Sequence, residues 1–380
     1  MKLPAMLARF TPPMPTGPIN HVGLSAGAVG AIGLLMIASV QVFGDPSAAR
    51  PKRIIALNAN SAAGPAFRAP LSDVVVDPGD ANVDPNLGFG MDPPDDDGAG
   101  AAPSSIAAAV VSPLVKAPIA KLTKPGPKGP LPIIAADGTT PMKAYRRPFT
   151  GDPTKPRVGI IIGGLGFNAR VTQSAIDELP ADVTLSFVPY ADNLQGWIDK
   201  ARARGHEVLI ELPMEPFDPD ANDTGPQTLL STAQPKDNIA KLENLLSRGA
   251  GYFGVSNYQG AKFAMSNTAS APVVKALKDR GLAFVSNGIG QRAALGAESV
   301  RAGLPFVAAD RVLDAQRDAD AIDDQLLNLE TLATQSGSSL GAGFAFPVTV
   351  EQVKTWADGL NARGLVLAPA SAIVDARQRR

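Results

Sequence analysis

The chain has 380 residues, of which 45% are hydrophobic and 19% are charged, and its formal net charge is −1. This length allows two or three domains, or one large domain with long extensions. The near-neutral charge gives no electrostatic reason to expect nucleic-acid binding. Because the chain has no cysteine and only two histidines, disulfides and thiolate metal sites are excluded, and we expect no metal site with two or more histidines.

Residues 22–44 predict a transmembrane anchor or signal, which follows a short N-terminal tail of residues 1–21. The core of this segment, Val22–Val40, is a run of 19 residues without a charge. About 20 apolar residues span the hydrocarbon core of a bilayer. The alternative is a cleaved signal peptide, whose apolar region normally covers only about 7–15 residues. We therefore expect an uncleaved anchor.

Residues 45–130 have the composition of a disordered linker. Proline recurs throughout, and no lysine or arginine occurs between Arg68 and Lys116, where eight aspartates accumulate. The charge then changes sign, because three further lysines follow Lys116 before residue 130. Such a stretch buries too little apolar surface to offset its conformational entropy, so we expect an extended spacer. The alternative interpretation is that its basic half binds an anionic polymer.

Residues 131–375 predict a folded domain, followed by a basic tail of residues 376–380. Short apolar runs predict eight strands, at Val158–Ile162, Val183–Val188, Glu207–Leu212, Tyr252–Val255, Leu282–Val285, Pro305–Ala308, Ser339–Gly343 and Leu365–Ala368. Helical spacing appears between these runs, and several helices end at a glycine. The alternation indicates an α/β fold, a distorted (β/α) barrel of seven or eight parallel strands; an open doubly wound sheet is the alternative.

The first predicted strand ends in a glycine-rich sequence. Gly164, Gly166 and Ala169 match the spacing of a dinucleotide-binding loop between a strand and a helix. The second strand, however, ends in Pro189 and Tyr190, where such a site has an acidic residue for the ribose. We therefore expect a tight glycine turn rather than a nucleotide site.

Other predicted strands also carry polar residues at their carboxyl ends, where α/β proteins place their chemistry. Glu211 and Glu215 at the third strand and Asp314 after the sixth are candidate catalytic acids or bases; alternatively, they are solvated or paired charges. The candidate ligand-binding residues are Asn257, Tyr258, Gln259, Ser286, Asn287, Phe344 and Phe346. Amides, hydroxyls and aromatic faces at one edge suit a neutral polyhydroxylated ligand such as a sugar. His206 precedes the third strand, so we expect it to be structural.

The order of these motifs resembles the divergent polysaccharide deacetylase family, which is related to the NodB-type deacetylases. The matching stretches within residues 157–374 are RVGIIIGGLG, VTLSFVPYA, GHEVLIELPMEPFD, YFGVSNYQGAKF, RGLAFVSN, VLDAQRDADAI and GLVLAPASAIV. The resemblance implies a distorted (β/α) barrel and a carbohydrate-linked role in the bacterial cell envelope, which agrees with the predicted anchor and spacer.

The resemblance also implies a divalent metal that polarises an acetyl carbonyl and activates water, but the implied ligand positions are substituted. The Asp-Asp pair that the resemblance implies is replaced by Gly163-Gly164, the third-strand His by Glu211, and the His after Asn-Asn by Tyr258. The implied Asp-Ser pair is replaced by Ser286-Asn287, and the two final His residues by Phe344 and Phe346. Asn257, Glu215 and Asp314 are retained. A catalytic zinc usually has three protein ligands, so we predict no metal and no cofactor.

These observations predict a pseudoenzyme that is anchored in the inner membrane by residues 22–44, with its C-terminal domain in the periplasm. We expect it to bind or scaffold an envelope polysaccharide, with Phe344 and Phe346 forming an aromatic surface for a sugar ring. The alternative is an active carbohydrate hydrolase, a deacetylase that uses carboxylates at the mouth of the barrel. No nucleic-acid partner is expected.

Overall fold

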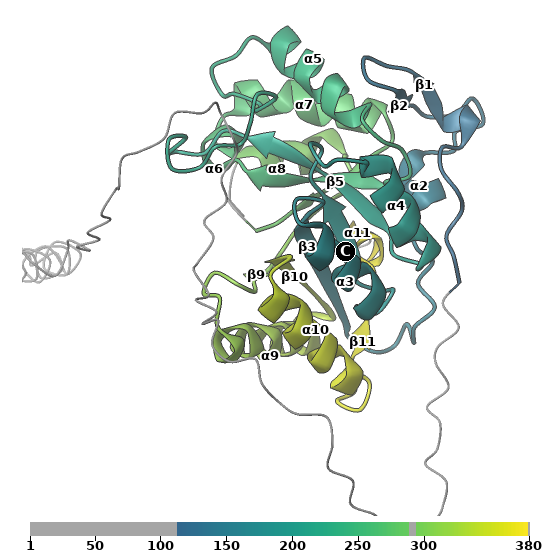
Figure 1. Cartoon of the computed structure of the whole chain (residues 1–380), viewed down its shortest axis with the longest axis vertical. Coiled ribbons are helices and arrows are strands. Elements are labelled where there is room, and N and C mark those ends of the chain that lie inside the picture. The colour runs from purple at the N-terminus through teal and green to yellow at the C-terminus, as the bar shows by residue number, and fades with distance from the viewer. Residues whose placement is uncertain (1–111, 289–293, 379–380) are drawn as a thin grey trace, which may run out of the picture. The chain divides into compact units, whose positions relative to one another are not determined.

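The computed structural model describes residues 112–288 and 294–378 (Figure 1). The predicted tail, the predicted anchor at residues 22–44, the linker up to residue 111 and residues 379–380 lie outside the described residues. None of the helices within the described ranges has the length and apolarity needed to cross a bilayer.

The centre of the fold is one sheet of nine strands, in which every pairing is parallel. The strands are β3 (Arg157–Leu165), β4 (Thr184–Phe187), β5 (Val208–Met214), β6 (Gly254–Gln259), β7 (Ala283–Ser286), β8 (Phe306–Ala308), β9 (Arg311–Val312), β10 (Ser338–Phe344) and β11 (Val366–Leu367). Their order is β8-β7-β6-β5-β4-β3-β10-β9, with β11 beside the start of β3. All eight strands predicted from the apolar runs are present.

The two ends of this strand order are joined by one short segment. β8 pairs with β7 and β9 pairs with β10, although only Ala309 and Asp310 separate β8 from β9. The Ala309 N–H donates to the Ser286 carbonyl at 2.9 Å, and the Asp310 N–H donates to the Leu340 carbonyl at 2.7 Å. The sheet is therefore strongly curled, as in a half-barrel, which confirms the predicted α/β class with a curved parallel sheet.

Helices surround the outside of the sheet (Figure 1). They are α3 (Ala169–Glu178), α4 (Leu194–Ala203), α5 (Pro235–Leu246), α6 (Ala261–Ala264), α7 (Asn267–Asp279), α8 (Ala294–Ala302), α9 (Ala319–Ser336) and α10 (Pro347–Leu360). In α9, the Asp318 carboxylate caps two N–H groups of the first turn, and Gly337 ends the helix at φ +73°. The buried face of α9 carries Ile322, Leu326, Leu329 and Ala333.

The sheet is apolar on both faces, because successive side chains of a buried strand point to opposite sides. Ile160 and Ile162 of β3 belong to a buried cluster that includes the inner faces of the outer helices. Ile161, between them, belongs to a second cluster with Ile373 of α11 (Ala370–Gln378). Helix α11 contacts β3, β7, β8 and β10. It therefore fills the inside of the curl.

Helix α11 meets the sheet at the amino ends of its strands. The Ala370 N–H donates to Thr184 Oγ1 at 2.9 Å, just where β4 begins. Ser371 donates to Glu207, the residue before β5, through both its N–H and its hydroxyl, at 3.0 and 2.6 Å. The amino end of the curl is thus closed, and only the carboxyl end is left as a mouth.

The described chain begins earlier than the predicted domain boundary at residue 131. Residues 112–130 include a turn of 3-10 helix at Ala120–Leu122 and strand β1 (Thr123–Pro125), which pairs with β2 (Pro130–Pro132). Leu122 is fully buried, and the Arg202 guanidinium donates to the Val115 carbonyl at 2.7 Å. The prediction of a disordered linker is therefore wrong for residues 112–130. A few apolar side chains and one buried arginine hold this proline-rich segment on the domain.

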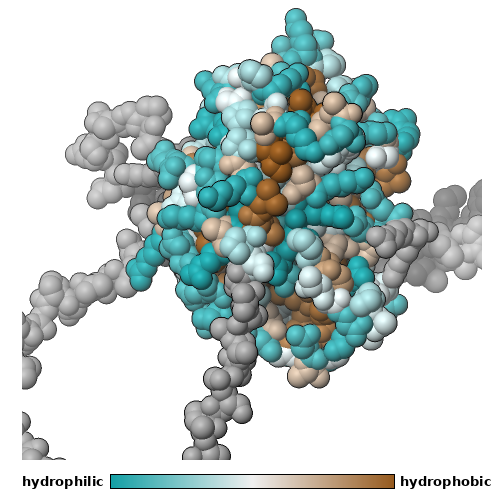
Figure 2. Space-filling model, turned by 90° about the vertical axis from the view of Figure 1, so that its right-hand side faces the viewer, coloured by the Kyte–Doolittle hydropathy of each residue, from teal (hydrophilic) through white to brown (hydrophobic). Residues whose placement is uncertain are grey.

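The surface of the domain is mainly polar. Figure 2 shows the side on which β1 and β2 lie, where hydrophilic residues cover most of the surface and hydrophobic residues gather toward the middle. The three most exposed large apolar side chains, Phe217, Met265 and Val300, lie on three different parts of the chain. Isolated exposed apolar residues are normal in folded domains, so they do not mark a site.

Candidate functional site

A small cavity opens at the carboxyl end of the curled sheet, where the sequence predicted the site. Its volume is about 30 Å³, which is room for roughly two water molecules. The residues that line it are Ile161, Gly163, Ser186, Glu211, Ser256, Asn257, Asn287, Val312, Ala342, Gly343 and Phe344. Four predicted site residues, Glu211, Asn257, Asn287 and Phe344, are thus brought together. Ser186 and Ser256, which are not among the candidate ligand-binding residues given above, share the cavity with them.

Glu211 is the carboxyl group of this cavity. Only 3% of the residue is exposed, and its Oε1 accepts a hydrogen bond from the Gly164 N–H at 2.6 Å. Its Oε2 is buried and has no hydrogen-bond partner within the described residues. Burial raises the pKa of Glu211 to about 8, although the Gly164 bond opposes that rise. Near neutral pH, Glu211 is therefore mostly a protonated acid, which can donate a hydrogen bond from Oε2.

The two glycines of the first strand end make room for this arrangement. A Cβ atom on Gly163 would lie 2.7 Å from Glu211 Oε1. Gly164 has a φ of +72°, which side chains disfavour, and a Cβ there would lie 3.2 Å from the Phe344 ring. The tight glycine turn is confirmed. Because the Gly164 N–H is bonded to Glu211, this loop does not present that N–H to a phosphate.

The amide and hydroxyl groups beside Glu211 largely bond to one another. Asn257 Nδ2 donates to Asn287 Oδ1 at 2.8 Å, while the Asn287 backbone N–H donates to Asn257 Oδ1 at 3.0 Å. The hydroxyl oxygens of Ser186 and Ser256 are 2.7 Å apart. This reciprocal bonding fixes the polar floor of the cavity in one arrangement. A ligand role for the two asparagines stays a prediction.

Three aromatic rings stand in a row at the mouth, and we call them the aromatic wall: Tyr258, Phe344 and Phe346. The Tyr258 and Phe344 ring centroids are 6.4 Å apart with an interplanar angle of 78°, and those of Phe344 and Phe346 are 6.1 Å apart at 38°. All three side chains are half-buried, and the Tyr258 hydroxyl forms no hydrogen bond to a described residue. The wall therefore presents partly exposed ring faces beside the cavity.

Glu215, the second candidate acid on β5, is engaged in structural contacts. Its Oε2 accepts from the Ser231 N–H at 2.7 Å and the Ser231 hydroxyl at 2.5 Å, and its Oε1 accepts from Lys262 Nζ at 2.7 Å. Burial opposes ionisation, but the bonds from Lys262 and Ser231 outweigh it and lower the pKa of Glu215. Glu215 thus ties the loop after β5 to α6 as an ionised carboxylate, and it does not line the cavity.

Asp314, the third candidate, is bonded to the backbone of Phe344 in the aromatic wall. Only 6% of it is exposed, and its Oδ2 accepts from the Phe344 N–H at 2.6 Å and from the Thr349 hydroxyl at 2.9 Å. Burial raises the pKa of Asp314 despite these two bonds. The carboxyl group therefore fixes the end of β10, the strand that carries Phe344.

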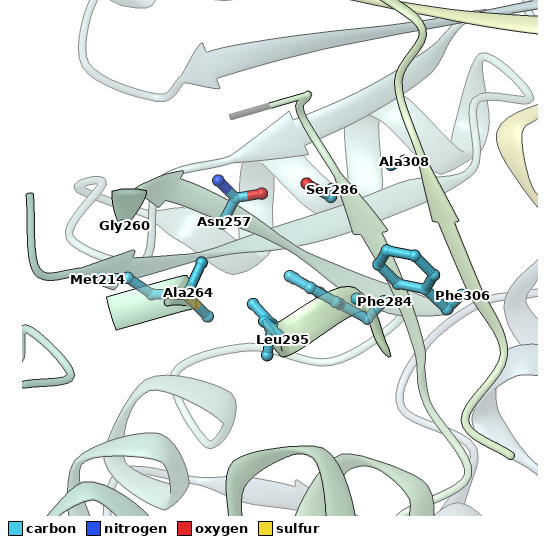
Figure 3. Close-up of a pocket in the computed structure, with 10 residues that line it drawn as sticks. Met214, Asn257, Gly260, Ala264, Phe284, Ser286, Leu295, Phe306 and Ala308 are labelled. Carbon is cyan, nitrogen blue, oxygen red and sulfur yellow. The ribbon is translucent and has the colours of Figure 1, made fainter. Parts of the chain in front are cut away.

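Gln259 and Ser286 lie away from the main cavity. Gln259 has a φ of +55°, and its side chain donates to Asn222 Oδ1 at 3.3 Å, in the long loop after β5. Ser286 lines a second cavity of about 10 Å³, which is room for roughly one water molecule. Figure 3 shows Ser286 and Asn257 on one side of this cavity and Leu295 with two phenylalanine rings near it. The second cavity is too small for a sugar.

The described residues do not fit the metal that the family resemblance implies. Within 112–288 and 294–378, no three His, Cys, Asp or Glu side chains come together closely enough to hold a metal ion. Glu211 is the one carboxyl group that lines the cavity, and its Oε1 is already bonded to Gly164. His206 is buried elsewhere, with Nδ1 2.9 Å from the Val183 carbonyl oxygen and Nε2 3.2 Å from that of Ile176. This placement agrees with its predicted structural role.

Comparison with known proteins identifies the family. The sequence model for divergent polysaccharide deacetylases matches residues 160–374, more than half of the chain. The crystal structure of the uncharacterized protein ATU2773 from Agrobacterium tumefaciens C58 is 35% identical with a TM-score of 0.63, over 64% of this chain and 99% of that one.

Two curated proteins are also similar. The uncharacterized protein YibQ of Escherichia coli K12 is 24% identical over 200 residues, which cover 51% of this chain and 60% of YibQ. An uncharacterized protein of Haemophilus influenzae is 22% identical over 195 residues, 51% of this chain and 68% of that protein. The matched part of this chain thus spans less than two thirds of YibQ. Together with the family match, these similarities show that the chain belongs to the divergent polysaccharide deacetylase family.

Proposed function

We propose that the protein binds an envelope polysaccharide at the mouth of its curled sheet and lacks the metal-dependent deacetylation that the resemblance implies. The observation that carries this proposal is the aromatic wall. Its three rings stand at positions where the resemblance implies metal-binding histidines. Partly exposed ring faces can pack against the C–H face of a sugar, while the nearby cavity admits one small substituent.

We further propose that residues 22–44 anchor the protein in the inner membrane, with the domain in the periplasm. The support is the run of 19 uncharged residues in Val22–Val40. The proline-rich residues 45–111 then act as a spacer between the membrane and the domain. This arrangement places the mouth within reach of the cell-envelope glycan. Protease accessibility of the domain in spheroplasts tests this proposal, because a cytoplasmic domain is protected until the membrane is broken.

The test of glycan binding is calorimetric titration of the purified full-length protein with β-1,4-linked N-acetylglucosamine oligomers and with other envelope glycans. Phe344→Ala and Phe346→Ala are each expected to weaken binding about tenfold, which is the stacking energy of one aromatic ring. Leu327→Ala, an exposed apolar residue on α9, is the matched control and leaves affinity unchanged. Metal-dependent release of acetate from the same oligomers contradicts the proposal.

A second candidate function is hydrolysis with Glu211 as a general acid. The unpartnered Oε2 and the pKa of about 8 favour it, because a buried protonated carboxyl can give its proton to a leaving group. However, no second carboxyl group lines the described cavity, and glycoside hydrolysis usually requires two. Slow glycan turnover that is lost in Glu211→Gln, while binding persists, favours this function.

A further inference from the structure

An arginine completes the row of aromatic rings at the mouth. The Arg317 guanidinium carbon lies 4.1 Å from the centroid of the Phe346 ring. Arg317 follows β9 in the chain and is exposed. The row therefore runs from Tyr258 on β6, across Phe344 and Phe346, and ends in a positive charge. Because the guanidinium is planar and stacked on a ring, its position is set before any ligand arrives.

This guanidinium forms no close ion pair with a carboxylate of the described residues, although Asp314 interacts with it electrostatically from beyond ion-pair distance. Seven other arginines form ion pairs with carboxylates there: Arg146, Arg147, Arg204, Arg280, Arg301, Arg363 and Arg377. Arg317 forms neither an ion pair nor a hydrogen bond within residues 112–288 and 294–378. An exposed guanidinium that is held in place and unpaired is free to bind an anionic group from outside.

The carboxyl groups around Arg317 are occupied elsewhere. Asp314 Oδ2 accepts from the Phe344 N–H and the Thr349 hydroxyl, and Asp318 Oδ1 accepts from two backbone N–H groups at the start of α9. Burial raises the pKa of Glu211 to about 8, so this carboxyl group is mostly uncharged near neutral pH. The oxygens of Asp314 and Asp318 that accept these bonds are thus committed to the backbone and Thr349, and the Arg317 guanidinium is left for an external anion.

We infer that the aromatic wall and Arg317 together bind a sugar ring that carries a carboxylate, as in a polysaccharide that contains uronic acids. The ring packs on Phe344 or Phe346, and its carboxylate reaches the guanidinium fork, whose two parallel N–H groups match two carboxylate oxygens. This inference rests on the proposed glycan binding and adds the chemical class of the glycan.

The test compares two ligands that differ at the carboxyl groups alone, which are free and charged in one and methyl-esterified and neutral in the other. Full-length protein is titrated with a galacturonic acid pentamer and with the same pentamer fully methyl-esterified. We expect the acid to bind about tenfold more tightly than the ester, the effect of one charge-assisted hydrogen-bonded pair. Arg317→Gln is expected to abolish this preference, so that the variant binds acid and ester with equal affinity. Arg317→Lys restores only part of it, because an ammonium group lacks the planar fork.

The control is Arg170→Gln. Arg170 is also exposed, near the start of α3 at the same end of the sheet, and no cation–π contact links it to an aromatic ring of the described residues. This variant keeps the preference for the acid. Phe346→Ala weakens binding of both ligands, because it removes the surface that the ring packs on and the support for Arg317.

The outcomes separate this inference from the proposed function. Equal binding of acid and ester, or a preference that survives Arg317→Gln, overturns the inference and leaves neutral glycan binding in place. Stronger competition by inorganic phosphate than by acetate also overturns it, since the site is then selective for phosphate. If neither pentamer binds, the inference is wrong, and the titration with neutral oligomers decides the proposed function separately.

Discussion

The carboxyl group of Glu211 occupies space that the missing side chain of Gly163 leaves free. A Cβ on Gly163 would lie 2.7 Å from Glu211 Oε1, so the two positions are sterically coupled. The family resemblance implies an aspartate at position 163 and a histidine at position 211. This chain instead has a glycine on β3 and the long carboxyl side chain of a glutamate on β5. The two substitutions therefore have to be understood together.

We predict that Gly163→Ala destabilises the protein by about 1–3 kcal/mol, because the new methyl group forces Glu211 out of its position. In a Glu211→Ala background the same substitution has little effect, since the carboxyl group it meets is gone. Chemical denaturation of the two single variants and the double variant measures this coupling. If the unfolding free energy lost in the double variant equals the sum of the losses in the two single variants, the two residues do not compete for space.

The raised pKa of Glu211 makes stability depend on pH. Between the pKa of an unfolded glutamic acid, near 4.5, and the folded value of about 8, the native state holds a proton that the unfolded state has lost. Stability therefore falls as pH rises through this window, by at most about 1.4 kcal/mol per pH unit. Glu211→Gln removes this contribution. Glu207 is also buried with a raised pKa, so only the difference between wild type and variant at pH 5 and 8 is diagnostic.

Arg202 is predicted to hold residues 112–119 on the domain. Its buried guanidinium donates to the carbonyl oxygens of Val115, Tyr145 and Gly251 at 2.7, 2.9 and 2.8 Å. Arg202→Met leaves these carbonyls without that donor. We expect it to lower the free energy of unfolding by about 3 kcal/mol. Limited proteolysis should then cut near residue 115. The control Arg204→Met removes an exposed ion pair with Asp177 and changes stability by less than about 1 kcal/mol.

Asp314 is predicted to be a positioning residue for the aromatic wall. Asp314→Ala removes the acceptor for the Phe344 N–H and is expected to cost about 1–3 kcal/mol in stability. It also weakens glycan binding, because Phe344 loses its fixed position. Asp314→Asn keeps an oxygen acceptor and restores affinity. If Asp314→Ala lowers the melting temperature but binds glycan as well as wild type, Asp314 is structural only.

The strands and the position of the mouth could be predicted from the sequence because parallel strands are buried on both faces and appear as short apolar runs. Val158–Ile162 and Ser339–Gly343 are such runs. Strand β9 was missed because Arg311 and Val312 pair with β10 over only two residues. The ordered segment 112–130 was missed because its stability depends on Arg202, which is distant in the sequence.

The candidate site could be predicted only in part. Glu211, Asn257 and Phe344 were found because each lies at or just beyond the carboxyl end of a predicted strand, and these ends of a parallel sheet meet at one edge. Whether a carboxylate at that edge is free or paired depends on contacts that sequence spacing does not encode. Glu215 is bonded to Ser231 and Lys262, whereas Glu211 keeps one oxygen unbonded. The contact of Arg317 with Phe346 joins two loops that no periodic pattern connects.

The helix that fills the inside of the curl has a consequence for what kind of polymer can be recognised. Since α11 closes the amino end of the sheet, the space beside Glu211 is a blind pocket, and a polysaccharide cannot thread through it. A polysaccharide bound as proposed would lie across the opening and insert only one substituent or one chain end. The protein would then recognise a substituent or a chain end of the glycan. The number of protein molecules bound per glycan would depend on how many such groups the glycan carries, and not on its length.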